Sequence, residues 1–345
     1  IDRSRLQFDF LTMSQGPGYY DAEIESLGGV VYPIGSPSKV GVVKHILQVI
    51  KVLKEKGPFH AVHAHTAYHA GIISLAAFLA GVKIRVVHSR SAGDPKSTGL
   101  GRKLYFSLMR ALIALFATDL VACGEDAGRF LYGDRQIKMG KVTIIKNAID
   151  ENRFRDLPHR NLELRKELGI GESTTVIGHV GSFSAVKNHE FLLSIASNLK
   201  KKKVDFEMVL VGDGQLRFSI EKRIEEAGLH DVITLLGIRS DVPQLMSMFD
   251  ILLLPSFYEG VPGVVVEAQA AGTPCVVSKS VTKEVDIGLG LLEFLSIDCE
   301  KDWCDAILKK GSKYAVDQRV VTDKLQLNGF TVDSSIEALY AIYSV

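Results

Sequence analysis

Short apolar segments with strand character alternate with helical segments along the chain, and this alternation restricts the fold more than any other feature. The first half predicts strands at residues 8–11, 30–33, 61–64, 84–88, 120–123 and 142–145, with helices at 40–56, 69–80 and 104–117. The second half predicts strands at 175–180, 207–211, 233–236, 251–254 and 275–277, with helices at 188–200, 216–227 and 242–248. Strands separated by helices form parallel βαβ units, so we predict an α/β fold with two Rossmann-like domains.

Residues 147–171 interrupt this alternation with a polar, charged run that contains Pro158 and is typical of a linker. A chain of 345 residues also exceeds one comfortable hydrophobic core. We therefore predict a first domain at residues 1–155 and a second at 156–330. An amphipathic helix within residues 331–345 has nothing left to extend in the second domain, so we expect it to pack back on the first.

Charge and cysteine content exclude several classes of protein. The formal net charge of +1, without a basic stripe, argues against nucleic-acid binding. The four cysteines are scattered, and the C-x4-C spacing of Cys299 and Cys304 has no second pair, so no zinc site is predicted from them. Free thiols suit a cytoplasmic protein.

The membrane signal is weak. The sequence shows no signal peptide and no run of about twenty apolar residues. Residues 104–117 are strongly apolar but too short to span a bilayer; we interpret them as a buried helix, with a helix lying on a membrane surface as the alternative. The expected location is the cytoplasm, with contact at the inner face of the membrane kept open.

The loop and helix at residues 259–267 carry the chemistry. Glu259 precedes a Gly/Pro turn, and Glu267 follows one helical turn later, giving E-x7-E. Pro262 suits a first helical position, and a helix start with uncovered amides binds anions such as phosphate. Acidic residues also favour a helix N-terminus because they interact well with the helix dipole. This preference does not explain Glu267, which interrupts the apolar series of residues 264–268. A carboxylate there suits a ribose diol.

Several motifs in fixed order carry a resemblance to a known family. They are Phe257 to Pro262 with Glu267 to Pro274, Asn147 to Asp150 with Phe154, Gly181 to Lys187, Val211 to Gly214, and Gly237 with Asp241. Together they resemble the family-four retaining glycosyltransferases of the GT-B fold, in particular bacterial enzymes of capsular, exopolysaccharide or lipopolysaccharide synthesis. The resemblance implies a hexosyltransferase that moves a sugar from a nucleotide diphosphate sugar to a glycan or lipid-linked glycan acceptor.

The resemblance also implies roles for individual residues. Glu259 would contact the donor sugar, Lys187 the diphosphate, and His88 would face the sugar from the first domain; these three are the expected catalytic residues. Glu267 would hold the ribose, and residues 237–239 would border the base. The expected donor-binding set is Ser182, Lys187, Gly237, Ile238, Arg239, Glu259, Gly260, Val261, Pro262, Gly263, Val264 and Glu267.

One position departs from the family pattern. Relatives usually place an arginine after the glycine at Gly181, and this chain has Ser182, so either Arg239 or another cation substitutes or donor affinity is weaker.

His63 and His65 form an H-x-H element that we interpret as structural. The chain contains no D-x-D, so no metal ligand and no cofactor is predicted, and leaving-group stabilisation without a metal is expected.

Other functions stay open at this stage. Relatives begin with one more strand and a glycine-rich loop, so the first domain is expected to lack its first strand beside residues 8–11, and we expect the chain to be a fragment of a longer protein. A nucleotide-sugar epimerase of the same fold and a non-catalytic nucleotide-sugar-binding protein are the alternatives. An NAD-dependent enzyme would need G-x-G-x-x-G after a strand, which the G-x-G at Gly99 and Gly101 does not supply.

Overall fold

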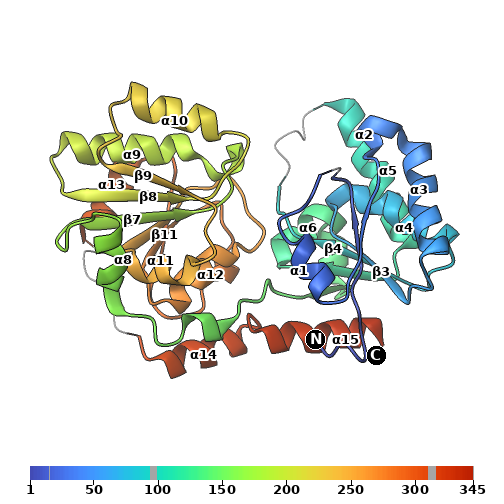
Figure 1. Ribbon diagram of the computed structural model, residues 1–345. Coiled ribbons are helices and arrows are strands. Elements are labelled where there is room, and N and C mark those ends of the chain that lie inside the picture. The colour runs from blue at the N-terminus through green and yellow to red at the C-terminus, as the bar shows by residue number, and fades with distance from the viewer. Residues whose placement is uncertain (15, 94–98, 310–315, 345) are drawn as a thin grey trace. The chain divides into compact units, whose positions relative to one another are not determined.

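The computed structural model describes residues 1–14, 16–93, 99–309 and 316–344 and divides into two compact units (Figure 1). The first unit comprises Ile1–Ile145 and Ile336–Val345, and the second comprises Lys146–Ser335. Residue 345, the last of the predicted C-terminal segment, lies outside the described residues. Within the described part of the chain, none of the helices combines the length and apolar character needed to cross a bilayer.

The division falls ten residues before the boundary predicted after residue 155, because residues 146–155 pack with the second unit. Asn147 Nδ2 donates to the carbonyl of Val261 at 2.9 Å, Ile149 forms a parallel bridge with Thr331, and Phe154 is buried. These contacts involve partners more than a hundred residues away, so the polar local sequence does not reveal them.

The first unit contains two parallel sheets. β1 (Phe10–Thr12) pairs with β2 (Val31–Pro33), and β3 (Ala61–Ala64), β4 (Ile84–Ser89), β5 (Asp119–Ala122) and β6 (Val142–Ile144) pair in that order. Among the described residues no ladder joins the two sheets, so the strand predicted at residues 8–11 has a partner on one side only. The helices are α1 (Asp21–Ser26), α2 (Pro37–Val40), α3 (Val42–Glu55), α4 (Ala70–Leu79), α5 (Leu100–Phe116), α6 (Glu125–Tyr132) and α7 (Asp134–Lys138).

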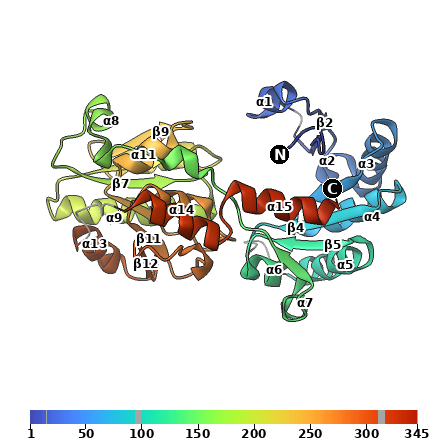
Figure 2. The ribbon, with the colours of Figure 1, turned by 90° about the horizontal axis from the view of Figure 1, so that it is seen from below.

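The C-terminal helix α15 (Val332–Tyr343) begins in the second unit and ends in the first. Its last turns pack Leu339, Ile342 and Tyr343 against Phe8 and the β4 residue Val86, and Figure 2 shows α15 ending beside β4. Apolar residues at helical spacing on one face of α15 explain this packing.

The second unit is a doubly wound parallel sheet in the order β12-β11-β10-β7-β8-β9. The strands are β7 (Thr175–Val180), β8 (Phe206–Val211), β9 (Ile233–Gly237), β10 (Ile251–Leu254), β11 (Cys275–Ser278) and β12 (Leu292–Leu295). The last of these was not predicted. The helices are α8 (Leu162–Glu167), α9 (His189–Lys201), α10 (Arg217–Glu226), α11 (Val242–Met248), α12 (Gly263–Ala270), α13 (Glu300–Lys309) and α14 (Gln318–Leu327).

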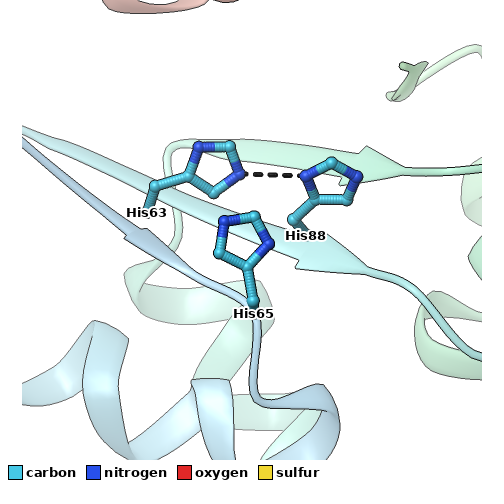
Figure 3. Close-up of side chains that lie close together, drawn as sticks. All are labelled: His63, His65 and His88. Atoms are coloured by element: carbon cyan, nitrogen blue, oxygen red, sulfur yellow. Dashed lines mark hydrogen bonds between the residues drawn. The ribbon is translucent and has the colours of Figure 1, made fainter. Parts of the chain in front are cut away.

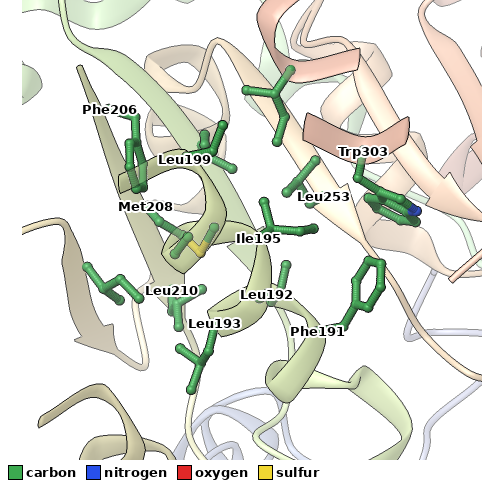
Figure 4. Close-up of a cluster of buried hydrophobic side chains, with 14 of the residues drawn as sticks. Phe191, Leu192, Leu193, Ile195, Leu199, Phe206, Met208, Leu210, Leu253 and Trp303 are labelled. Carbon is green, nitrogen blue, oxygen red and sulfur yellow. The ribbon is translucent and has the colours of Figure 1, made fainter. Parts of the chain in front are cut away.

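Helices cover both faces of this sheet, which is why its central strands are mostly apolar along their length. All four residues of β10 are buried, as are all four of β11. Figure 4 shows one of the two layers, where Leu192, Ile195 and Leu199 of α9 pack on Met208 of β8 and Leu253 of β10. Trp303 of α13 closes this cluster.

Candidate functional site

The strand order of the second unit locates a crevice at the carboxyl ends of its strands. β7 is followed along the chain by β8 and β9 on one side of it, whereas β10, β11 and β12 lie on its other side. The direction of winding therefore reverses between β7 and β10, and open parallel sheets bind ligands at such a switch point. The segments that follow these two strands are Gly181 to Lys187 and Pro255 to Pro262.

Lys187 and Glu259 meet at this switch point. Lys187 ends a short 3-10 turn, Ala185–Lys187, and its Nζ lies 2.7 Å from Glu259 Oε1. The two side chains are 15% and 16% exposed, so the pair is largely shielded yet reachable. The amide of Phe257 donates to the carbonyl of Val186 at 2.9 Å, which joins the two loops next to the pair. Two residues expected to act in the same reaction are thus brought together.

The start of α12 lies directly after this pair. Pro262 is the N-cap residue and α12 begins at Gly263, so the prediction of Pro262 as the first helical residue was wrong by one position. An added Cβ at Gly263 would meet nothing within 4 Å, so there is free space beside the helix start. Gly260 and Val261 are buried, and Val264 is partly buried. A helix N-terminus with room beside it is suited to an anionic group.

Glu267 lies one turn further along α12 and is largely shielded from water. Burial raises the pKa of Glu267 above its ordinary value, and the positive charge of Arg153 opposes this rise. Arg153 itself donates to the carbonyl of Ser240 at 2.9 Å. A shielded carboxylate with unused acceptor capacity can accept hydrogen bonds from two neighbouring hydroxyl groups.

Glycine is required where the loops after β7 and β8 cross. An added Cβ at Gly212, whose φ is +135°, would lie 2.0 Å from the carbonyl oxygen of Gly181. One at Gly214 would lie 2.6 Å from the carbonyl oxygen of Phe183. The motif Gly212-Asp213-Gly214 is therefore explained by close approach of two backbones, which keeps the Gly181 to Lys187 loop in place.

The loop after β9 contributes a second charged pair. Arg239 donates to Asp241 through Nε at 2.7 Å and through a terminal nitrogen at 2.5 Å, while Ile238 is exposed. Gly237 has a positive φ of 67°, and the Arg217 guanidinium lies 3.5 Å from where its Cβ would be. The sequence analysis did not predict that Arg217 lies near the loop after β9. The structure shows this because α10, which carries Arg217, lies close to the end of β9.

Ser182 is exposed and its hydroxyl lies 3.2 Å from that of Ser184. The bidentate pairing of Arg239 with Asp241 satisfies that guanidinium locally. Among the described contacts, therefore, nothing places Arg239 in the role of a missing arginine beside Ser182.

His179 was also missed by the sequence analysis. It is fully buried in β7, and its Nδ1 lies 2.9 Å from the carbonyl oxygen of Leu253. Its Nε2 lies 3.4 Å from the position a Cβ would take on Gly181, so the ring supports the loop that leads to Lys187. Burial, and the neighbouring His189 and Lys187, lower the pKa of His179 to about 3, which keeps the ring neutral.

His88 belongs to the first unit, where it is 2% exposed at the end of β4. Figure 3 shows it beside His63 and His65, with His63 Nε2 3.1 Å from His88 Nδ1. These three histidines form the one group of potential metal ligands found among the described residues. The interpretation of His63 and His65 as structural stays a prediction; His63 lies on β3 and His65 directly follows its last residue.

Two family models match the chain, a glycosyl transferase 4-like domain over residues 1–148 and glycosyl transferases group 1 over residues 161–287. The putative glycosyltransferase EpsF of Bacillus subtilis (strain 168) is 38% identical over 346 residues, which covers 100% of this chain and 90% of the relative. The chain is a family-four glycosyltransferase.

Two further comparisons extend this result. The UDP-Gal:alpha-D-GlcNAc-diphosphoundecaprenol alpha-1,3-galactosyltransferase of Escherichia coli is 27% identical over 68% of this glycosyltransferase and 62% of its own length. The crystal structure of Anabaena Alr3699/HepE in complex with UDP-glucose matches with a TM-score of 0.73 at 20% identity, covering 98% and 99% of the two chains. The predicted GT-B fold, with two Rossmann-like domains, is thereby confirmed.

Proposed function

We propose that this glycosyltransferase moves a sugar from a nucleoside diphosphate sugar to a hydroxyl group of a growing bacterial surface glycan, with retention of the anomeric configuration. The observation that carries the proposal is the Lys187–Glu259 pair at the switch point, beside the open start of α12. The similarity to the Bacillus and Escherichia glycosyltransferases, and to the Anabaena protein whose structure was solved with UDP-glucose, supports it.

The donor would bind along the carboxyl edge of the second sheet. Its diphosphate carries negative charge, which the α12 N-terminus and the Lys187 ammonium are suited to receive. Glu267, three residues after Val264 on α12, would accept the ribose hydroxyls, and the segment from Gly237 to Arg239 would border the base. We take uridine as the base because the structural neighbour was solved with UDP-glucose.

The transfer needs little covalent chemistry from the protein. The bond between the sugar C1 and the leaving phosphate oxygen breaks, a bond from C1 to the acceptor oxygen forms, and the proton of the acceptor hydroxyl passes to the departing phosphate oxygen as the nucleoside diphosphate leaves. Charge gathers on the leaving diphosphate, where Lys187 would stabilise it. Glu259, whose Oε1 is 2.7 Å from Lys187 Nζ, would then be released to bind hydroxyl groups of the sugar.

We further propose that the acceptor is lipid-linked and that the enzyme touches the membrane through α5. Leu100, Leu104, Leu108 and Leu115 are between 55% and 86% exposed on this helix, which corrects the prediction that residues 104–117 form a buried helix. An exposed apolar row on a helix is costly in water and suits the interface of a bilayer. His88 would face the donor sugar, as the resemblance implies.

The test is transfer from UDP-glucose, UDP-galactose and their N-acetylated forms to a diphosphoundecaprenol-linked sugar, in the presence of EDTA. We expect acceptor-dependent release of UDP and an α-linked product. Conversion of the donor to its epimer without acceptor would instead indicate an epimerase. Binding of UDP without any turnover would indicate a non-catalytic protein, and either result would overturn the proposal.

A further inference from the structure

Three imidazole rings converge on one face of the first unit's larger sheet. His63 lies on β3 and pairs in register with Val86 of β4, so His88, two residues after Val86, faces the same side as His63. His65 follows the last residue of β3, and its ring stacks on that of His63 with centroids 4.3 Å apart. One nitrogen from each ring can be chosen so that all three lie within 4.8 Å of one another. Figure 3 shows a nitrogen of His63 facing one of His88, with the ring of His65 close to both.

The outer nitrogen of His63 is already held. His63 Nδ1 lies 2.5 Å from the hydroxyl oxygen of Tyr343, which α15 brings to the end of β3. When Nδ1–H donates to that oxygen, the lone pair of Nε2 faces His88 Nδ1, 3.1 Å away. A hydrogen bond on the far nitrogen is how proteins commonly fix the tautomer and orientation of a metal-binding histidine.

A metal ion binds the lone pair of a neutral imidazole nitrogen, and each of the three rings can offer one. Three neutral imidazoles are the ligand set of open zinc sites, whereas Mg²⁺ and Ca²⁺ require oxygen ligands.

We propose that His63, His65 and His88 bind one divalent transition-metal ion, with Zn²⁺ as the best match, and leave a fourth coordination position open. His88 binds through Nδ1 and carries its proton on Nε2, a buried atom that has no hydrogen-bond partner among the described residues. The site is argued from this geometry and not from the proposed transfer reaction, although an ion bound at His88 would occupy the side chain proposed above to face the donor sugar.

Arg90 opposes the metal at His65. Its Nε donates to His65 Nδ1 at 2.9 Å, which leaves the proton of the neutral ring on Nε2. A metal at Nε2 requires this proton to move to Nδ1, so the bond from Arg90 must break. The guanidinium charge also repels a cation. Loss of the arginine side chain should therefore tighten metal binding.

The experiment titrates the metal-free protein with Zn²⁺ by calorimetry and with Co²⁺ by visible absorption. We expect one ion per chain with the absorption of four-coordinate cobalt, about tenfold or more weaker binding in His65→Gln and His63→Gln, and about tenfold tighter binding in Arg90→Gln. His65 is exposed, so His65→Gln should fold normally, which circular dichroism can check. The matched control, His230→Gln, alters an exposed histidine in the second unit.

Failure of the unaltered protein to bind either ion would overturn the site. Binding that His65→Gln leaves unchanged would overturn it equally, since the ion would then sit elsewhere. Neither readout uses glycosyl transfer, so failure of the proposed function would leave this test intact.

Discussion

The ammonium of Lys187 and the carboxylate of Glu259 form an ion pair with 2.7 Å between Nζ and Oε1, although they are 72 residues apart in the sequence. The pair joins the loop after β7 to the loop after β10. Each partner therefore holds the other in place before any ligand arrives. A bound diphosphate would compete with Glu259 for the same ammonium group.

Lys187→Ala should weaken UDP binding by about 10- to 100-fold, because a hydrogen bond to a charged group contributes about 1.5 to 3 kcal/mol. Calorimetric titration with UDP measures this, and Lys222→Ala, on the exposed face of α10, is the control. If Lys187 binds the diphosphate, adding Glu259→Gln to Lys187→Ala should cost little further UDP affinity. Equal UDP affinity in Lys187→Ala and the unaltered enzyme would contradict the assignment.

Glu267→Gln should stabilise the ligand-free protein while weakening nucleotide binding. Burial raises the pKa of Glu267 in the folded protein above 4.5, so the carboxyl group holds its proton more tightly in the folded than in the unfolded state. The protonated group therefore makes its full contribution to stability below the pKa of the unfolded state. That stability is lost as pH rises through the folded pKa. Glutamine has no such loss, so the advantage of the variant in Tm should grow from about pH 4.5 towards neutral pH.

Thermal unfolding with and without UDP measures both effects of Glu267→Gln. The variant should lose most of the shift in Tm that UDP produces in the unaltered enzyme. Glu225→Gln, which changes an exposed carboxylate on α10, should behave like the unaltered protein. A Tm advantage for Glu267→Gln that does not vary with pH would disprove the role of burial.

Gly212→Ala should lower the stability of the protein, whereas Gly263→Ala should lower its affinity for the UDP-sugar. At Gly212 the new methyl group would lie 2.0 Å from a carbonyl oxygen at a φ of +135°, so we expect a loss of stability above about 3 kcal/mol. At Gly263 the methyl group meets no protein atom, so stability should be kept. UDP-sugar affinity should nevertheless fall, because that space is where the donor phosphates are proposed to lie; denaturant unfolding and calorimetry distinguish the two.

Asp250→Asn should destabilise the second unit by about 3 to 5 kcal/mol, because it leaves the buried Arg165 guanidinium without its counter-charge. Asp250 and Arg165 are 3% and 1% exposed and lie 2.7 Å apart. Asp317→Asn, at an exposed carboxylate in the same unit, should change little. Urea unfolding gives both values, and similar midpoints for the two variants would refute the expectation.

Ser182→Arg should strengthen donor binding by about tenfold, since Ser182 is exposed and Arg239 is held by Asp241. A guanidinium can bind a phosphate through two parallel hydrogen bonds, which a hydroxyl cannot do. The Kd for UDP measures the gain. Ser184→Arg, two residues along the same loop, is the comparison, and an equal gain there would show a non-specific charge effect.

The sequence by itself determined the two series of strands and helices, because strand and helix periodicity is local. Its resemblance to family-four glycosyltransferases implied the GT-B fold and the role of the E-x7-E loop. Most strand positions agreed to within two residues. Only the tertiary structure decided which residues meet: Lys187 with Glu259, Arg165 with Asp250, and His63 with His65 and His88. It also assigned residues 146–155 to the second unit and showed that several leucines of α5 are exposed to solvent. These outcomes depend on strand order and on packing between distant segments, and neither leaves a periodic pattern in the local sequence.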